Sequence, residues 1–214
     1  VGKSTVFNNL TGLNQHTGNW PGKTVTNALG YCKSGDMTYA LVDIPGTYSL
    51  MAHSAEEEVA RNFICFGEPD AVVVVCDATC LERNLNLALQ TIEITDNVIV
   101  CVNMMDEAKK KNIKIDLDDL SDKLGVTVIG ITARKKKSSD KLTESLGELF
   151  GNDAAKKPVK IQYSYPIENA VGIIEPVIKQ KIGGKINARW LSLKLLDYDQ
   201  ALTDALNEYL GYDI

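Results

Sequence analysis

The chain has no long apolar stretch. Its longest apolar runs, such as residues 71–76, are far shorter than the roughly 18 residues that a membrane-spanning helix needs. Its start, Val1-Gly2-Lys3-Ser4, lacks the charged beginning and the following apolar segment of a signal peptide. We therefore expect this chain to be soluble. Because it does not begin with Met, we also expect that the natural N-terminus lies upstream of Val1.

Paired cysteines and a positive net charge are also missing. The five cysteines include no Cys-x-x-Cys pair, so we expect reduced thiols in a cytosolic protein and no disulfide framework. Lys and Arg number 23 against 28 Asp and Glu, and the net charge of -5 argues against a general nucleic-acid binder. Of the 214 residues, 44% are hydrophobic, which supplies a sizeable core and excludes general disorder.

Short apolar runs alternate with helical patterns over the first 150 residues. The apolar runs predict buried, mostly parallel strands at residues 39–42, 71–76, 98–102 and 126–131. The helical patterns cover residues 4–10, 55–66, 81–95, 117–124 and 141–150. This alternation predicts a three-layer α/β domain. Residues 28–32 and 37–42 instead predict a hairpin, which gives the sheet one antiparallel edge.

The composition changes near residues 151–158, which are mostly polar. Three helical patterns follow without an intervening strand, at residues 166–181, 187–196 and 199–210, and Pro176 should kink or interrupt the first. We therefore predict a first domain over residues 1–152, a linker over 153–160 and a small helical domain over 161–214. About fifty residues bury too little surface to be stable alone, so the helices should pack on the first domain. Their expected contacts are Trp190, Leu193 and Leu196.

The first chemical motif is Gly2-Lys3-Ser4-Thr5, which opens a predicted helix. It matches the end of a phosphate-binding loop, in which backbone N–H groups hold phosphate oxygens, Lys adds a positive charge and Ser offers a hydroxyl to Mg²⁺. The upstream glycine and strand of such a loop are absent. Alone, these four residues are also compatible with an ordinary helix start.

Three further motifs follow in order, each at the end of a predicted strand. Asp43 and Gly46 form Asp-x-x-Gly, where the Asp can hold Mg²⁺ through water and the Gly N–H can approach a γ-phosphate. Asp106, in the segment 103–106, can accept both N–H groups of guanine, a pair that adenine does not offer, and this predicts selectivity of about a thousandfold. In the segment 131–134, the Ala133 N–H can donate to the guanine carbonyl.

With these motifs the sequence resembles a Ras-like GTPase of the translation-factor-related class. It is more closely similar to FeoB, the family of bacterial ferrous iron transport protein B. The resembling segments are residues 18–25 (GNWPGKTV), 42–50 (VDIPGTYSL), 76–85 (CDATCLERNL), 103–106 (NMMD) and 189–196 (RWLSLKLL). The resemblance covers nearly the whole chain. It implies a Ras-like P-loop GTPase domain followed by a small all-helical domain over residues 161–214, which in the family acts like an inhibitor of GDP dissociation.

The resemblance also implies a role for each motif residue. The phosphates would be bound by Gly2, Lys3, Ser4 and Thr5, and the base by Asn103, Asp106, Thr132 and Ala133. Mg²⁺ would be held by Ser4, Asp43 and, in the GTP state only, Thr24. Thr24 and Gly46 would take part in hydrolysis, within a switch I over residues 18–27 and a switch II over residues 46–54. The implied K⁺ ligand, an Asn of the phosphate loop, would precede Val1.

Two positions depart from the family pattern. Met104 stands where the usual Lys follows Asn103, which removes a charged prop beneath the base and suits loose nucleotide binding. Thr47 stands where Ras-like proteins carry a catalytic Gln, so the attacking water must be positioned by another group.

The implied function is a GTP-binding, slowly GTP-hydrolysing switch that regulates ferrous iron uptake. Its partners would be GTP or GDP and its own C-terminal membrane domain, with homo-oligomers formed through that domain and no nucleic acid. It would lie at the cytoplasmic face of the bacterial inner membrane. The main alternative is a stand-alone regulatory GTPase, for example in ribosome assembly. A P-loop ATPase or kinase is disfavoured by Asn103, Asp106 and Ala133, and a non-enzymatic binding module stays open because the phosphate loop is incomplete.

Other chemical groups have simpler interpretations. His53 beside residues 56–58 (EEE) could hold iron, but solvation is the simpler interpretation. Cys76 and Cys80 could ligate a metal, although Cys76 ends a buried strand. The basic run 134–137 (RKKK) is interpreted as a solvated loop, with anionic lipid or a partner as the alternative. Arg61 and Arg83 are remote candidates for arginine fingers, and pairing on the helix surface with Glu57, Glu58 or Glu82 is the favoured interpretation.

Overall fold

A computed structural model describes residues 1–12, 15–19, 26–51, 54–135, 137–151 and 156–214. The elements of its first part are α1 (Lys3–Thr11), β1 (Gln15–Asn19), β2 (Thr26–Ser34), β3 (Met37–Asp43), α2 (Ala55–Phe66), β4 (Val72–Asp77), the 3-10 helix η1 (Ala78–Cys80), α3 (Leu81–Ile94), β5 (Val98–Asn103), α4 (Met105–Lys110), α5 (Leu117–Leu124), β6 (Thr127–Gly130) and α6 (Lys137–Gly151). The elements of its second part are α7 (Tyr165–Ile182), α8 (Ala188–Leu196) and α9 (Gln200–Leu210).

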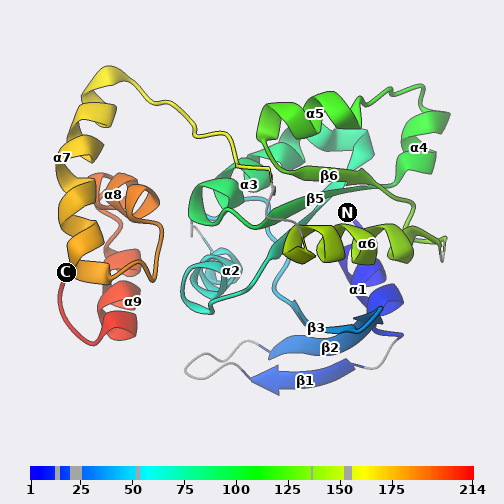
Figure 1. Ribbon diagram of the computed structural model, residues 1–214, viewed down its shortest axis with the longest axis horizontal. Coiled ribbons are helices and arrows are strands. Elements are labelled where there is room, and N and C mark those ends of the chain that lie inside the picture. Colours follow the sequence, from blue (N-terminus) through cyan, green and yellow to red (C-terminus); the bar gives the residue numbers. More distant parts are fainter. Residues whose placement is uncertain (13–14, 20–25, 52–53, 136, 152–155) are drawn as a thin grey trace.

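The centre of the first part is a parallel sheet covered by helices on both faces (Figure 1). Strand β5 lies between β4 and β6, and every one of its residues is buried. Because side chains alternate along a strand, Val98, Val100 and Val102 pack toward α3, α4 and α5, while Ile99 and Cys101 pack toward α1 and α6. This explains why the strand is apolar on both faces and confirms the predicted α/β architecture.

A second, antiparallel sheet has the order β1-β2-β3. The predicted hairpin is confirmed: Ser34 pairs with Met37 around a loop in which Gly35 has φ 58°. Strand β1, which pairs with β2 from Gln15 to Asn19, was not predicted. Its sequence, QHTGN, does not alternate apolar and polar residues, so the sequence pattern gave no sign of a strand. The strand forms by pairing with β2.

Hydrogen-bonded ladders do not join β3 to β4 among the described residues, so the two sheets are separate. An apolar cavity of about 690 Å³ lies between them. Strands β3 and β4 line it together with α1 and α6, through Phe7, Tyr39, Val73 and Leu146 among others. The sequence predicted a single, mostly parallel sheet with one antiparallel edge. The structure instead has two three-stranded sheets, separated by this cavity, which we call the slot.

Helix bounds follow local capping. Helix α5 has the predicted bounds because the Asp116 carboxylate accepts a hydrogen bond from the Asp119 N–H (3.0 Å) and Gly125, at φ 66°, ends the helix. Helix α2 also has the predicted bounds, capped by Ser54. Helix α7 continues through Pro176 to Ile182, so the predicted interruption is not seen.

The helical part shares a core with α2 and α3. Trp190, Leu191 and Leu206, all buried, pack in one cluster with Leu50 and Ile64. The Tyr163 hydroxyl also donates to the Glu93 carboxylate of α3 (2.6 Å). The predicted packing on the first part is therefore present.

The predicted contact residues of that packing are only partly right. Trp190 is buried, and Leu193 is half-buried. The prediction for Leu196 was wrong, because this residue is 37% exposed. Leu191 and Leu195 of the same helix occupy the packed positions. Burial on α8 follows contact with α7 and α2, which the sequence of α8 alone does not reveal.

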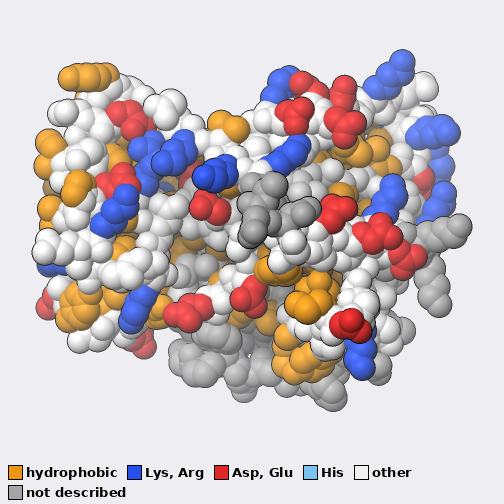
Figure 2. All heavy atoms as spheres, in the orientation of Figure 1, with side chains coloured by type: hydrophobic (Ala, Val, Ile, Leu, Met, Phe, Trp, Pro, Cys, Tyr) orange, Lys and Arg blue, Asp and Glu red, His pale blue; other side chains and the backbone are white. Residues whose placement is uncertain are grey.

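The surface carries two further patterns. Figure 2 shows apolar side chains along the outer edge of α7, where Tyr165, Ile173 and Val177 are exposed. Basic side chains gather at the opposite end, over α4 and the loop after it. Among the described residues, no helix combines the length and apolarity needed to cross a membrane.

Candidate nucleotide-binding site

The start of α1 is shaped for close approach of a backbone. Gly2 precedes the helix with φ 81°, a conformation that costs other residues about 1–2 kcal/mol. A Cβ at Gly2 would also lie 2.6 Å from the Asn103 Nδ2. Ser4 and Thr5 are exposed in the first turn of α1. The predicted phosphate motif therefore forms the N-terminus of α1. Position 2 requires glycine for two reasons, its positive φ and the closeness of the Asn103 side chain.

Lys3 lies against the end of β3. Its ammonium forms an ion pair with the Asp43 carboxylate and donates to the Ile44 carbonyl (2.7 Å). Gly46 lies beside the same side chain, since a Cβ there would be 3.8 Å from the Lys3 Cε. The structure thus brings the first two motifs together, with a cation and a carboxylate that neutralise each other.

Asn103, at the end of β5, joins the third and fourth motifs to the first. Its Nδ2 donates to the Val1 carbonyl (3.0 Å), and its Oδ1 accepts from the Ala133 N–H (2.9 Å). Asn103 is 3% exposed, and its bond to Ala133 is buried, while its bond to the exposed Val1 is partly buried. The Ala133 N–H, which we expect to face the guanine carbonyl, is engaged by Asn103 here.

The loop around Thr132 is fixed from several sides. The Ser138 hydroxyl accepts from the Thr132 N–H (3.2 Å) and donates to the Thr132 carbonyl (2.7 Å). The Asn9 amide of α1 donates to the Ala133 carbonyl. Neither Ser138 nor Asn9 was found from the sequence, because a single Ser or Asn carries no motif.

Asp106 lies in the first turn of α4 and is half-buried. Met104, immediately before the helix, has φ 64°, which is uncommon for a residue other than glycine. Its conformation turns the chain from β5 into α4, and the Met105 N–H donates to the Ile131 carbonyl (3.2 Å). The segment 103–106 is thereby tied to the segment 131–133.

The segment after Gly46 is held against α3. The Gln90 Oε1 accepts from the Leu50 N–H (2.6 Å), and the Arg83 guanidinium stacks 4.1 Å over the Tyr48 ring. The Thr47 hydroxyl donates to the Ser49 carbonyl (2.6 Å) and is used within its own turn. Gln90 was not predicted as part of the site, since its role depends on the packing of α3 against this segment.

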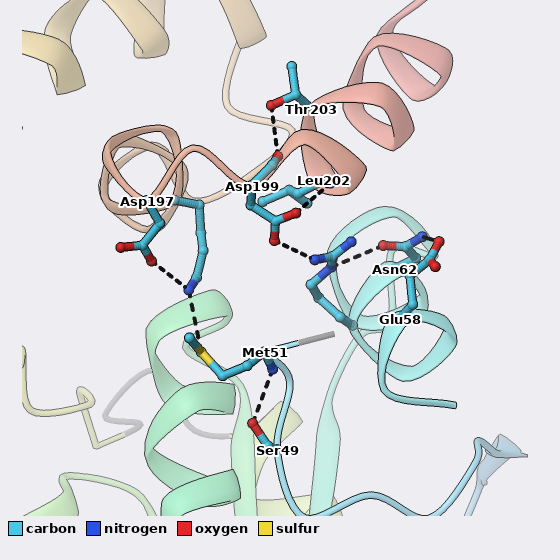
Figure 3. A network of polar contacts seen from close by, with 10 residues as sticks. Ser49, Met51, Glu58, Asn62, Asp197, Asp199, Leu202 and Thr203 are labelled. Atoms are coloured by element: carbon cyan, nitrogen blue, oxygen red, sulfur yellow. Dashed lines mark hydrogen bonds and ion pairs between the residues drawn. The ribbon is translucent and has the colours of Figure 1, made fainter. Parts of the chain in front are cut away.

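The two arginines considered as arginine fingers have other partners. Arg83 stacks on Tyr48, and Arg61, fully buried, pairs with Asp199 of the helical part (2.8 Å; Figure 3). Within the described residues, Arg83 thus contacts Tyr48, and Arg61 pairs from a buried position with Asp199 and not from the helix surface.

Several predicted groups lie outside this geometry. Thr24 and His53 fall outside the described residues, as does part of the basic run. Cys76 is buried with its Sγ 3.9 Å from the Asn84 carbonyl, and burial raises the pKa of its thiol to about 12. Cys80 is exposed. Among the described residues, no group of three His, Cys, Asp or Glu is placed to hold a metal ion.

Comparison with known proteins gives a consistent result over both parts. The family model of ferrous iron transport protein B matches residues 1–146, and that of the FeoB cytosolic helical domain matches residues 163–212. The Fe(2+) transporter FeoB of Escherichia coli (strain K12) is 37% identical over 202 residues, which cover 92% of this chain and 26% of the transporter. The chain thus spans about a quarter of the length of the curated relatives it matches.

Solved structures agree with the sequence relatives. The cytosolic domain of the T. maritima FeoB iron transporter in a GDP form has a TM-score of 0.86 at 31% identity, covering 100% of this chain and 84% of that one. Its GMPPNP form has the same TM-score and identity, with 100% and 83% covered. The cytosolic domain of L. pneumophila FeoB has a TM-score of 0.80 at 32% identity, with 98% and 90% covered. Because models of the G domain and the helical domain match in order along the sequence, the chain belongs to the ferrous iron transport protein B (FeoB) family.

Proposed function

We propose that this chain is a guanine-nucleotide switch that binds GTP and GDP with Mg²⁺, hydrolyses GTP slowly and regulates ferrous iron uptake through an attached membrane domain. The observation that carries the proposal is the meeting of all four motifs around the start of α1 through Lys3–Asp43 and Val1–Asn103–Ala133. The related T. maritima structures in GDP and GMPPNP forms support the nucleotide class. Both family models are FeoB models, which favours this proposal over a stand-alone regulatory GTPase.

Base recognition would depend on Asp106. Its carboxylate would accept hydrogen bonds from the ring N–H and the exocyclic N–H of guanine. Adenine would leave the carboxylate unpaired, which would cost about 4 kcal/mol of binding free energy. Asn103, Thr132 and Ala133 would complete the pocket, with the Ala133 N–H turned from the Asn103 Oδ1 to the guanine carbonyl or shared between them. Met104 supplies no charge beneath the base, which suits fast nucleotide release.

Phosphate binding would exchange the partner of Lys3. Its ammonium now faces the Asp43 carboxylate, and β- and γ-phosphate oxygens would replace that carboxylate. The N–H groups of the first turn of α1, with Gly2, Ser4 and Thr5, would hold further oxygens.

The donor set also suits Mg²⁺. The Ser4 hydroxyl and the Asp43 carboxylate are hard oxygen ligands of the kind that this ion prefers. Ser4, Thr24 and Asp43 would hold the ion, which when bound supplies positive charge to the phosphate oxygens. K⁺ is a further candidate ion, with its ligand upstream of Val1.

Hydrolysis needs a positioned water and a sensor of the γ-phosphate. The Gly46 N–H would be the sensor and Thr24 the switch I residue that closes over the site. Thr47 occupies the position of the usual Gln, and its hydroxyl already bonds within its turn, so a backbone group would orient the water.

The organisation of the protein follows from this proposal. Residues 1–152 would form a G domain that lacks its first strand and part of its phosphate loop, 153–160 a linker and 161–214 the helical domain. The cavity between β3 and β4, beside Lys3, supports the place of that strand. The membrane domain would lie beyond residue 214 at the inner membrane, with homo-oligomers formed through it.

The test is the nucleotide preference of an Asp106→Asn variant, measured in the 214-residue chain and in a longer form that begins upstream. Wild type should bind GDP about a thousandfold more tightly than ADP. Asp106→Asn should weaken GDP binding and improve the relative affinity for XDP, which carries a carbonyl where guanine carries an amine. Glu107→Gln, one residue away, is the matched control and should leave both affinities unchanged. Wild-type GDP affinity in Asp106→Asn would refute the proposed base site.

A further inference from the structure

The outward side of α7 is largely apolar and carries no charge. With about 3.6 residues per helical turn, one side of α7 presents Asn169, Ile173, Pro176, Val177 and Gln180, and all five are exposed. We call these five residues the α7 face. Ile173 is 68% exposed and is the most exposed large aliphatic residue in the described part of the chain. In a chain with 24% charged residues, an exposed face without charge is typical of a contact surface.

The α7 face is turned away from the rest of the fold. The opposite side of the helix carries Val171, Ile178 and Ile182, which are buried, and the latter two belong to the core that also contains residues of α2 and α8. A Cβ built at Gly172 would meet no atom within 4 Å, so the space beside Ile173 is open. Figure 2 shows apolar side chains along this outer edge of the molecule. The fold therefore uses one side of α7 and leaves the other side free.

Basic and aromatic side chains flank the α7 face. Lys179 and Lys181 in the last turn and Lys185 after it are exposed. Lys179 pairs with Glu175 (2.8 Å), whereas the other two lysines form no ion pair with described residues. Tyr165, at the start of the helix, is 82% exposed. An apolar helix face with lysines beside it and an amphipathic aromatic residue at its end is typical of a helix that lies at a bilayer surface.

The end of the chain lies at the same place. The Tyr212 hydroxyl donates to the Lys181 carbonyl (2.6 Å), and Figure 1 shows the C-terminus beside α7. The chain covers only 26% of the length of the Escherichia coli transporter that it matches. A membrane domain that continues from residue 214 would therefore start next to the lysine-bearing end of α7 and bring this helix close to the bilayer.

We propose that the α7 face lies on a bilayer surface that contains anionic phospholipids, with Ile173 and Val177 between the head groups and Lys179, Lys181 and Lys185 beside the phosphates. The inference rests on the proposed attachment to a membrane domain. That attachment keeps the chain at the membrane, so a surface of modest affinity is sufficient. A second copy is a less suitable occupant, because a stable protein interface takes about 20–30 residues from each partner and the α7 face has five.

The first test is cosedimentation of the 214-residue chain with lipid vesicles. Partitioning to phosphatidylcholine vesicles with about 30% phosphatidylglycerol should be at least about fivefold stronger than to pure phosphatidylcholine. It should weaken as salt is added, because the lysines act through the charge of the surface. Equal partitioning to the two kinds of vesicle, or binding to neither, would overturn the proposal.

A pair of double variants tests the apolar part of the surface. Ile173→Gln/Val177→Gln removes both aliphatic side chains and keeps residues suited to a helix. Ile113→Gln/Val159→Gln is the matched control, with the same changes at positions outside α7 that are 37% and 50% exposed. The α7 variant should partition at least about tenfold more weakly than wild type, and the control should not change. Unchanged binding of the α7 variant, or an equal loss in the control, would refute the assignment.

A second pair of variants tests the charges. Lys181→Gln/Lys185→Gln should weaken binding to the anionic vesicles by about fivefold per lysine, while binding to pure phosphatidylcholine should stay the same. Lys109→Gln/Lys111→Gln is the matched control, at two exposed lysines in the basic surface over α4 and the loop after it. A loss in the control and none in the α7 variant would assign the bilayer to the surface over α4 and contradict the proposal.

Two measurements without lipid separate the other interpretations. Self-association that Ile173→Gln/Val177→Gln abolishes in sedimentation equilibrium would assign the α7 face to a second copy and overturn the proposal. GDP binding reports on the proposed nucleotide site alone. If wild type binds anionic vesicles but no guanine nucleotide, the nucleotide site fails and the lipid surface stands. The reverse result keeps the nucleotide site and refutes the lipid surface.

Discussion

Replacing Leu50 by Ala tests whether the segment after Gly46 shares a core with the helical part. Leu50 is 4% exposed and packs with Trp190 and Leu191. The substitution removes buried carbon atoms but keeps the backbone N–H that donates to Gln90. It therefore isolates the contribution of side-chain packing.

The expected cost follows from burial. Leu-to-Ala changes in cores cost 2–5 kcal/mol, and a segment outside helices and strands can partly close the space, so we expect about 2–3 kcal/mol. For a chain of this size that corresponds to a fall in Tm of roughly 4–12 °C. The loss should appear in urea unfolding followed by tryptophan fluorescence, with a lower midpoint and an unchanged slope.

Leu196→Ala is the matched control, with the same change on an exposed side chain of α8. It should cost less than about 1 kcal/mol. Equal losses of stability in the two variants would refute the shared core and would restore Leu196 to the packing role that its sequence position suggests.

Three further predictions concern other parts of the chain. Gly2→Ala should lower Tm more than Gly12→Ala, because both positions have positive φ but only the Cβ at Gly2 would meet another side chain; equal shifts would leave backbone strain as the sole cause. A thiol reagent should label one cysteine rapidly in the native chain and five after unfolding, with Cys80→Ser abolishing the rapid phase; rapid loss of a second thiol would contradict the burial of the other four. The bond to Arg189 lowers the pKa of Glu168 from 4.5 to about 2. The stabilising effect of this bond, measured as the difference in Tm between wild type and Glu168→Gln, should therefore be complete above pH 4.5 and disappear as the pH falls toward 2. A difference that stays constant over this range would disprove the linkage.

The sequence was informative wherever a local pattern determines the outcome. Helix α5 lies between a capping Asp116 and Gly125, and both ends were predicted. Asp43 and Asn103 were placed at strand ends because each follows a short apolar run, and the structure has them as the last residues of β3 and β5. Carboxyl ends of parallel strands share one edge of a sheet, which places Asn103 at the end of β5 beside Ala133 in the segment after β6.

The remaining features depend on contacts that no local pattern encodes. Arg61 and Asp199 are separated by 138 residues, and an Arg on a helix with acidic neighbours has the same appearance as a surface residue. Gln90 acts only because α3 lies beside Leu50. Strand β1 forms because β2 offers it a pairing edge. Each of these requires the tertiary arrangement before the residue acquires its role.

The slot between β3 and β4 has a consequence for handling the protein. Two strand edges without a ladder partner in the described chain border one apolar cavity, and such edges accept an added strand from any extended polypeptide. We therefore expect the 214-residue chain to accept an added strand, and concentrated samples should self-associate through this cavity. An extended peptide that fills it would join the antiparallel and parallel sheets into one and would suppress that association.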